Sequence, residues 1–434
     1  MSPSSPSQQH HQILIVGGGA AGITVASQFL LARKGLDVAI LEPSSDHYYQ
    51  PGWTLVGGGV MTQEQTRRDE ADLIPAGCSW IRAAAASFEP EANQVTTTDG
   101  DTISYDALVL ATGLELRWER IKGLKEALGR QGVTSNYSRE HLPYTWATIR
   151  HFPGGTAIFT FPDTPIKCAG APQKIMYMAD DIFKATSGVG VNTKVVFATA
   201  GPGIFGVPVY ARVLKKVVEE RGIQVLLRHN LKEIRADEQV AVFEVSDAEG
   251  PISRKEIPFT MIHAVPPMSA PDVIAQSPLA TSAPGGWVEV DKFSTQHVRY
   301  PNVFSLGDVS SLPTSKTAGA VRGEAPVLVA NLLAQLAGKP LQARYDGYSV
   351  CPLITGYDKV VMAEFDYDLQ PVSSFLIDPT RERWSMWLMK TKGLPWIYWN
   401  RMLKGQPHES RFLKPFKPLM QALGLSYKGE PSAS

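Results

Sequence analysis

Cys168 has the surroundings that most favour covalent chemistry. It stands between a strand expected at 157–161 and a helix expected to begin near Pro172, with Lys167 beside it. A helix N-terminus and a lysine both place positive potential on the sulfur, which lowers the pKa of a thiol toward neutrality. The segment therefore predicts a thiolate nucleophile near neutral pH.

The other two cysteines carry weaker signals. Cys351 lies far along the chain, and sequence separation cannot show whether its sulfur meets that of Cys168; two inert, buried thiols are the simpler alternative. Cys78 precedes an expected strand, where a structural thiol is the simplest interpretation. Three cysteines in 434 residues argue against a disulfide-stapled scaffold and a zinc site built on CxxC pairs. The 9 histidines show no metal-ligand spacing, so we expect no metal.

A glycine-rich turn near the N-terminus has the pattern of a dinucleotide site. The motif Gly17-x-Gly19-x-x-Gly22 joins an apolar strand to a helix, and Glu42 ends the next strand. These glycines allow a tight turn, close approach of backbone to a pyrophosphate and close helix-strand contact, while the acid can accept a hydrogen bond from a ribose hydroxyl. We expect a strand at 13–16, a helix at 20–33, a strand at 37–41, and cofactor contacts at Gly17, Gly19, Ala20, Ala21, Gly22 and Glu42.

A second strand-turn-helix unit with a glycine-rich turn lacks the acidic residue that would bind a ribose. A strand at 194–200 leads into the glycine-rich turn 201–206 and a helix that runs through Glu220. The next strand, 223–227, ends in Arg228 and offers no carboxylate for a ribose. A site for a 2′-phosphate on Arg228 is one alternative, but a duplicated fold whose nucleotide pocket has been lost or reassigned is the better one.

Two further motifs return the chain to the first unit. Thr112-Gly113 follows a strand at 105–110, and Gly307-Asp308 follows a strand at 303–306. Together with the first glycine motif they resemble the set seen in FAD-dependent oxidoreductases with two dinucleotide domains. That resemblance implies that Thr112 and Gly113 close over the cofactor and that Gly307 and Asp308 bind its ribityl or pyrophosphate part.

The expected architecture is α/β, with two Rossmann-like domains and a C-terminal amphipathic helical segment for membrane attachment. The first domain is discontinuous because the second is inserted into it. We expect the FAD-binding domain at 1–150 and 286–350, the second domain at 151–285, and a region that holds Cys351 and the membrane surface at 351–434.

The C-terminal segment differs in composition from the rest. The whole chain balances 42 basic against 42 acidic residues, which argues against nucleic acid as a partner, yet 381–428 holds ten Lys and Arg against two acids. Four of the 9 tryptophans, Trp384, Trp387, Trp396 and Trp399, fall here at helical spacing, with Leu388, Lys390, Lys392, Leu403 and other apolar and basic residues nearby. Such a pattern favours attachment to an anionic membrane surface. Packing against the core or a second subunit is the alternative. No segment here is both long and apolar enough to span a membrane.

The whole sequence resembles the sulfide:quinone oxidoreductases, in particular the branch that includes the mitochondrial enzymes. The similarity runs from about residue 11 to the C-terminus. It is carried by 160–162, 165–174, 307–317, 351–357, 49–51 and 363–367, and the two cysteine-containing segments are the most specific.

This resemblance implies that Cys168 and Cys351 are a redox pair. Sulfide would attack the bridged pair at Cys351, leave a persulfide there and free Cys168 as a thiolate that donates into the flavin; a membrane quinone then reoxidises the flavin. It also places Gln50, Lys316, Thr317 and Ala318 at the cofactor, the last three at a helix N-terminus facing the pyrimidine ring.

The chain departs from the bacterial branch, which has a third essential cysteine upstream of Cys168. Residues 133–138 contain none. We therefore expect non-covalent FAD and a two-cysteine cycle that hands sulfane sulfur to a small thiol or similar acceptor. Two alternatives stay open: an NADH:quinone oxidoreductase of the same architecture, and a non-catalytic membrane-bound sulfide sensor.

The N-terminal tail sets the expected location. Residues 1–12 are rich in Ser, Pro and Gln and resemble neither a secretory signal nor a transit peptide. We expect a peripheral protein of a bacterial inner membrane, on the cytoplasmic side, with a homo-oligomer as a further possibility.

Overall fold

The first of the two main sheets is built on β1, which ends at the glycine turn. The computed structural model describes residues 8–246, 251–375 and 377–406. The strand order is β5-β2-β1-β8-β7-β6, with β19 also paired to β8; β1 is parallel to β2 and β8. The bounds are β1 (Gln8–Val16), β2 (Val38–Leu41), β5 (Cys78–Ile81), β6 (Ala85–Glu89), β7 (Gln94–Thr97), β8 (Thr102–Leu110) and β19 (Val303–Ser305).

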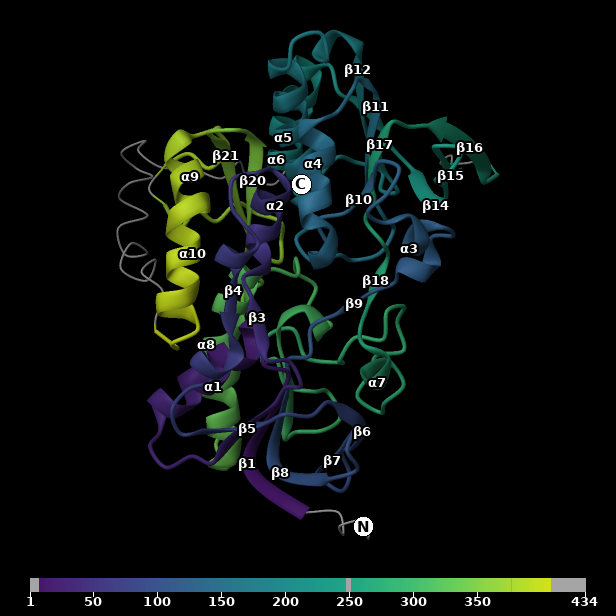
Figure 1. The fold of residues 1–434 in the computed structure, drawn as a ribbon. Coiled ribbons are helices and arrows are strands. Elements are labelled where there is room, and N and C mark those ends of the chain that lie inside the picture. The colour runs from purple at the N-terminus through teal and green to yellow at the C-terminus, as the bar shows by residue number, and fades with distance from the viewer. Residues whose placement is uncertain (1–7, 247–250, 376, 407–434) are drawn as a thin grey trace.

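Two helices, α1 (Ala20–Ala32) and α8 (Ala318–Leu336), pack with this sheet. Residues 13–16, 38–41 and 107–110 are buried, as expected of parallel strands covered on both faces. β19 is parallel to β8, so residues 303–305 lie in the first sheet, far along the chain from its other strands. Figure 1 shows this sheet at the bottom of the molecule, near the N-terminus.

The second sheet is wholly parallel, in the order β10-β17-β11-β12-β13. Its strands are β10 (Val133–Thr134), β11 (Gly155–Phe161), β12 (Thr193–Thr199), β13 (Gln224–Leu226) and β17 (Met261–His263). Its helices are α4 (Leu142–Arg150), α5 (Ala171–Ala185) and α6 (Pro208–Arg221). Because β10 already belongs to this sheet, the chain crosses between the two sheets before residue 133, earlier than a boundary at 150 implies.

Smaller elements join and extend the two sheets. They are the pair β9 (Glu115–Leu116) and β18 (Met268–Ser269), the sheet β14 (His229–Arg235), β15 (Val240–Val245) and β16 (Ser253–Pro258), the pair β3 (Asp46–Tyr48) and β4 (Arg67–Asp69), and the helices α2 (Trp53–Gly57), α3 (Leu124–Ala127) and α7 (Asp272–Ala275).

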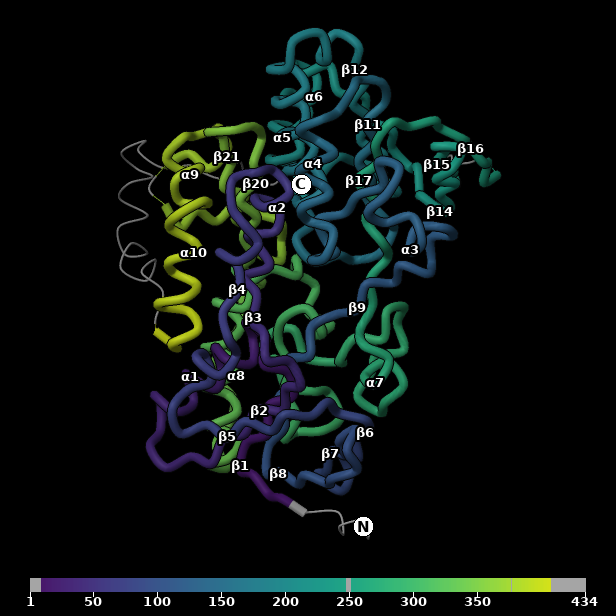
Figure 2. The backbone as a smooth tube through the Cα atoms, in the orientation of Figure 1, coloured from purple at the N-terminus to yellow at the C-terminus, as the bar shows by residue number. Residues whose placement is uncertain are grey.

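The C-terminal part is a hairpin followed by a helical rod. The hairpin pairs β20 (Ser349–Gly356) with β21 (Lys359–Phe365). The rod comprises α9 (Trp384–Leu388), a π-helical turn (Met389–Gly393), α10 (Leu394–Ile397) and a second π-helical turn (Tyr398–Met402). It lies beside β3 and β4 (Figure 2), so an early and a late segment of the described chain pack together.

The tryptophan pattern of the rod divides between two faces. Trp384, Leu388 and Trp396 are exposed, at 59%, 40% and 55%, whereas Trp387 and Leu403 are buried. The expectation that these residues share one side of a helix is therefore wrong for Trp387 and Leu403, which pack inward. Lys390, expected near the basic surface, is also buried. No helix of the described ranges is long and apolar enough to cross a membrane, and residues 407–428 of the predicted basic segment lie outside those ranges.

Candidate active site

The glycine turn after β1 is shaped by two backbone contacts that allow no side chain. Gly17 has φ +107°, and a Cβ there would lie 2.4 Å from the carbonyl oxygen of Ala111; a Cβ at Gly22 would lie 1.8 Å from that of Gly17. A Cβ at Gly19 would meet open space within 4 Å. The turn is thus packed behind and open in front, which is the shape a pyrophosphate needs.

Glu42 braces this turn from the end of β2. Its Oε2 accepts a hydrogen bond from the backbone N–H of Gly18 at 2.7 Å, and its Oε1 accepts one from Ser44 at 2.8 Å. The carboxylate therefore stands at the edge of the turn, where a ribose hydroxyl could reach it.

We expect Gly22→Ala to abolish stable binding of the cofactor. The new methyl group overlaps a backbone carbonyl that is fixed by β1, so the turn must open or the helix must move away; we expect FAD affinity to fall at least ~10-fold and the protein to lose stability. The flavin-to-protein absorbance ratio of the purified variant measures this. Gly206→Ala is the control, because Gly206 has no positive φ and a Cβ there would meet nothing within 4 Å.

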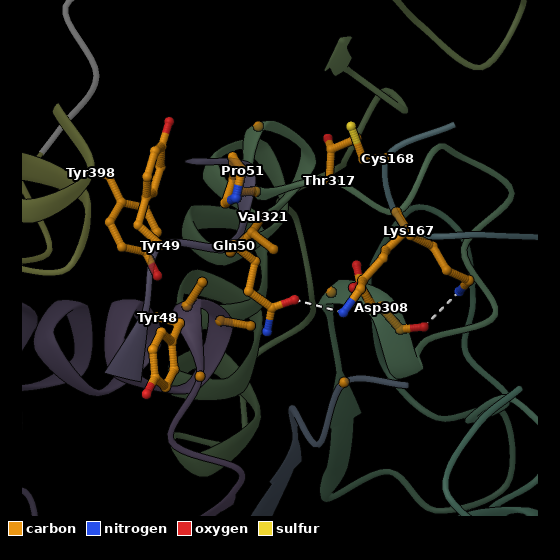
Figure 3. Close-up of a pocket in the computed structure, with 18 of the residues that line it drawn as sticks. Tyr48, Tyr49, Gln50, Pro51, Lys167, Cys168, Asp308, Thr317, Val321 and Tyr398 are labelled. Atoms are coloured by element: carbon orange, nitrogen blue, oxygen red, sulfur yellow. Dashed lines mark hydrogen bonds between the residues drawn. The ribbon is translucent and has the colours of Figure 1, made fainter. Parts of the chain in front are cut away.

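A single cavity extends from the glycine turn to Cys168. The predicted cofactor residues that line it are Gly17, Gly19, Ala20, Ala21, Glu42, Gln50, Thr112, Gly113, Gly307, Asp308, Lys316, Thr317 and Ala318. Gly22 stands behind the turn instead. Figure 3 shows Gln50 and Asp308 at the middle of this cavity, with Cys168 and Thr317 at one end and Tyr398 at the other. Their roles as cofactor contacts remain predictions.

The loops around the cavity are held by their own hydrogen bonds. The Lys316 amine donates to the carbonyl oxygens of Asp308 and Ser310, at 2.7 and 2.9 Å, and burial lowers its pKa to about 8. Thr317 caps α8 by accepting from the N–H of Ala320 at 3.0 Å, so the predicted helix start at Ala318 is confirmed. Gln50 accepts from Lys167 at 2.7 Å (Figure 3).

Cys168 occupies a strained loop between β11 and α5. Its φ is +53°, a left-handed conformation that is uncommon for a residue with a side chain. Its N–H donates to the carbonyl of Lys316 at 2.9 Å, and the hydroxyl of Tyr137 donates to the carbonyl of Lys167 at 3.1 Å. These bonds fix the loop and hold the thiol at the cavity.

Cys351 reaches the same place from β20. A Cβ on Gly170, just before α5, would lie 2.5 Å from the Cys351 sulfur, so a glycine there lets the strand approach the helix. The two thiols share a hydrogen bond and are both unbridged in this structure. The structure thus brings the two cysteines together, which spacing along the chain could not show.

The two sulfurs have opposite electrostatic environments. The hydrogen bond from Cys351 and then the ammonium groups of Lys174 and Lys390 hold the pKa of Cys168 well below that of an ordinary thiol, against the effect of burial. The same bond and burial raise the pKa of Cys351. Of the two thiols, Cys168 is therefore the one that loses its proton more readily.

Lys174 is the nearest cation, with its amine 3.1 Å from the Cys168 sulfur. Lys390 is 2% exposed, donates to the carbonyl oxygen of Pro51 at 2.8 Å, and has its pKa lowered to about 7 by burial and by Lys174. Sequence reasoning assigned this effect to Lys167, whose amine instead binds Gln50. Lys174 lies on the first turns of α5, a position that could have identified it; nothing in the sequence marked Lys390.

Cys78 lies on β5 in the first sheet, away from this cavity. Burial is the main cause that raises its pKa to about 12. Such a thiol is a poor nucleophile at neutral pH.

A mixed sheet with a glycine turn at β1, a second and wholly parallel sheet, and two thiols at the end of the cavity, one buried and one partly exposed, define a flavin-dependent disulfide oxidoreductase. Residues 11–143 match the family model described as pyridine nucleotide-disulphide oxidoreductase. The cavity fits FAD for two reasons. The absence of a side chain at Gly19 leaves the front of the glycine turn open to a pyrophosphate. The buried hydroxyl of Thr112 has no protein partner among the described residues and is available to a ligand.

Within that class, the chain belongs to the sulfide:quinone oxidoreductase family. It is 45% identical over 407 residues to the mitochondrial sulfide:quinone oxidoreductase of Mus musculus, with 94% of this chain and 89% of that protein covered. The mitochondrial enzyme of Dictyostelium discoideum is 48% identical over 398 residues, with 91% and 86% covered. The sulfide:quinone oxidoreductase structure from Aquifex aeolicus superposes with a TM-score of 0.77 at 21% identity, covering 94% of this chain and 95% of that one, and so shares the fold.

The chain is therefore an FAD-dependent oxidoreductase whose substrates are sulfide and a quinone. Three of the relatives are named as mitochondrial enzymes, and the expectation of a bacterial inner membrane finds no support among them.

Proposed function

We propose that Cys168 and Cys351 form the disulfide that sulfide attacks, and that electrons pass from Cys168 to the flavin and then to a membrane quinone. The observation that carries this proposal is the hydrogen-bonded thiol pair beside Lys174, at the end of the cofactor cavity. FAD, when bound, supplies a two-electron acceptor next to these sulfurs.

The charges around the pair determine which sulfur is attacked. In thiol-disulfide exchange the thiol of lower pKa leaves faster. Because Lys174 and Lys390 stabilise the Cys168 thiolate, hydrosulfide attacks Cys351, the disulfide bond breaks, and Cys168 leaves with the electron pair. Cys351 then carries the new sulfur as a persulfide, and no net electrons have yet left the protein.

Release of the sulfur completes the cycle. A small thiolate attacks the outer sulfur of the Cys351 persulfide, takes it as a new persulfide and returns Cys351 as a thiol. Oxidation of the two thiols to the disulfide then delivers two electrons to the flavin. The absence of a cysteine in 133–138 supports transfer to a small acceptor over growth of a long sulfur chain, and it supports non-covalent FAD.

A second cavity is the candidate route for this acceptor. It has a volume of about 560 Å³ and is lined by Ile166 and Ala169, which flank Cys168, and by Ser315 and Lys316. It shares Lys316 with the lining of the cofactor cavity and adjoins the Cys168 loop. Its size suits a small thiol.

The proposal is tested with the purified holoenzyme by turnover. Sulfide-dependent reduction of a soluble quinone is expected, whereas anaerobic NADH is expected to leave the flavin oxidised. Prompt bleaching by NADH would favour the NADH:quinone oxidoreductase, and absence of turnover with sulfide would favour the sensor.

We infer further that the rod rests on the membrane surface. Trp384, Leu388 and Trp396 project from it, and Lys392 and Lys404 are exposed nearby. Tryptophan and lysine in this combination suit the interface of an anionic bilayer. Peripheral attachment there would bring a membrane quinone close to Lys390, Leu394 and Ile397, which line the cofactor cavity. Association of several copies stays a prediction.

The double variant Trp384→Ser/Trp396→Ser is expected to bind anionic vesicles roughly 10-fold or more weakly, because two large apolar side chains no longer enter the interface. Vesicle co-sedimentation measures this, and the flavin spectrum should be unchanged. Val191→Ser, which alters an 88% exposed apolar residue next to β12, is the control and should bind as the parent does. Equal vesicle binding by the parent, the double variant and the control would show that the exposed tryptophans of the rod do not contact the membrane.

A further inference from the structure

Glu70 is a buried carboxyl group with one free oxygen. It follows β4 and is 1% exposed. Its Oε2 bonds to Nδ1 of His47 at 3.0 Å, whereas its Oε1 has no hydrogen-bond partner within the described residues. A buried carboxyl oxygen without a partner is costly, so this atom is a candidate for binding a ligand group.

The free oxygen is directed at the glycine turn. A Cβ at Gly18 would lie 2.5 Å from Glu70 Oε1 and 2.6 Å from Cγ of Glu42, so both acids adjoin the same residue of the turn. Both also line the cofactor cavity. Each oxygen of Glu42 already accepts a backbone N–H. Glu70 therefore offers the unused acceptor at this point.

We propose that Glu70 accepts a hydrogen bond from a hydroxyl of the adenosine ribose of FAD, and that it links FAD binding to docking of the C-terminal rod. The proposal rests on FAD as the cofactor and is independent of the chemistry assigned to the cysteines. Glu70 carries the first link through its free oxygen and the second through His47.

A continuous buried chain forms the second link. Nε2 of His47 bonds to the hydroxyl of Tyr398 at 2.6 Å, and His47 and Tyr398 are each 3% exposed. With a neutral imidazole, Tyr398 donates to Nε2 and Nδ1–H donates to Glu70, so every bond in the chain is satisfied. The rings of His47 and Trp399 are 5.8 Å apart. Tyr398 and Trp399 belong to the rod, so its docking orients the imidazole that holds Glu70.

The same part of the rod is also fixed to the first domain by contacts outside the Glu70–His47–Tyr398 chain. The hydroxyl of Ser27 on α1 donates to the carbonyl of Leu403 at 2.6 Å. Tyr398 also packs on Tyr49, with ring centroids 4.8 Å apart, and Figure 3 shows the two rings side by side at the end of the cavity away from Cys168. By linkage, a cofactor that stabilises this arrangement must bind more weakly when the rod is detached.

Release of FAD from the holoenzyme tests the first link. Glu70→Gln keeps the size and shape of the side chain but replaces one of its two acceptor oxygens by an NH2 group. We expect FAD to dissociate at least ~10-fold faster from this variant, as measured by flavin fluorescence. Glu64→Gln, an exposed acid in the same stretch, is the matched control and should release FAD as the parent does. Equal release by Glu70→Gln and the parent would overturn the proposal.

The second link has its own readouts. Tyr398→Phe should also speed FAD release, and the Glu70→Gln/Tyr398→Phe pair should show less than the sum of the two effects in free energy, because both act through His47. Removal of FAD from the unaltered protein should increase protease cleavage within 389–406. Additive effects, or equal cleavage with and without FAD, would overturn the link, and the cleavage test decides even if Glu70→Gln fails to fold.

Discussion

Replacement of Cys168 by alanine is expected to lower sulfide-dependent quinone reduction by at least ~1000-fold. Without this sulfur no disulfide can form with Cys351, and hydrosulfide has no bond to break. Lys174 and Lys390 would also lose the thiolate that they stabilise. Steady-state turnover with a soluble quinone measures the loss, and stopped-flow bleaching of the flavin by sulfide locates it in the reductive half of the cycle.

Two further alanine variants serve as a second test and as a control. Cys351→Ala removes the other half of the pair and should lose activity to a similar extent, with FAD still bound. Cys78→Ala alters a thiol on β5 whose pKa burial raises to about 12, and should keep the parent rate. Retained turnover in either Cys168→Ala or Cys351→Ala would remove the basis of the mechanism.

Replacement of Lys174 by methionine is expected to shift the pH dependence of flavin reduction. Lys174 is the nearest cation to Cys168 and, after the bond from Cys351, lowers the pKa of this thiol. Its loss should raise that pKa, so the fraction of thiolate at neutral pH falls and Cys168 becomes a poorer leaving group. We expect the rate to fall roughly 10- to 100-fold near neutral pH, and less at alkaline pH.

The pH profile distinguishes this effect from a simple loss of packing. The acid limb of the rate of sulfide-dependent bleaching should move to higher pH in Lys174→Met, and Lys174→Arg should recover part of the shift. Lys194→Met changes an exposed lysine on β12 and should leave the profile in place. An unshifted limb in Lys174→Met would show that this ammonium does not set the charge on the sulfur.

Local patterns were sufficient to predict the elements around the cofactor. The expected helix at 20–33 is observed as Ala20–Ala32, and the expected strand at 37–41 as Val38–Leu41. The glycine turn and the start of α8 could also be predicted from the sequence, because turns and helix caps depend on residues only a few positions away. Whether Cys168 meets Cys351 could not be predicted from local patterns, because the answer depends on how β20 packs against Gly170.

The structure of the rod shows why helical periodicity did not predict which of its residues are buried. Two π-helical turns, Met389–Gly393 and Tyr398–Met402, interrupt the usual 3.6-residue repeat and rotate the faces that follow. Lys390 in the first turn and Leu403 after the second therefore point inward, although a regular repeat placed them with the outer residues. Trp387 precedes both turns, and it is buried because α9 packs it against Tyr357. Glu70 and Lys390 could not be predicted as site residues, because their partners, His47 and Pro51, are brought to them by tertiary packing.

The most direct test of the proposed disulfide chemistry is a single-turnover titration. Oxidised holoenzyme is mixed anaerobically with one equivalent of sulfide and a small thiol, without quinone, and flavin reduction and sulfane sulfur are measured together. We predict one flavin reduced and one sulfane sulfur formed per sulfide, with the sulfur found as a persulfide on Cys351 when the thiol is omitted. Flavin reduction at the parent rate in the Cys168→Ala/Cys351→Ala variant, or sulfur bound at another residue, would contradict the mechanism.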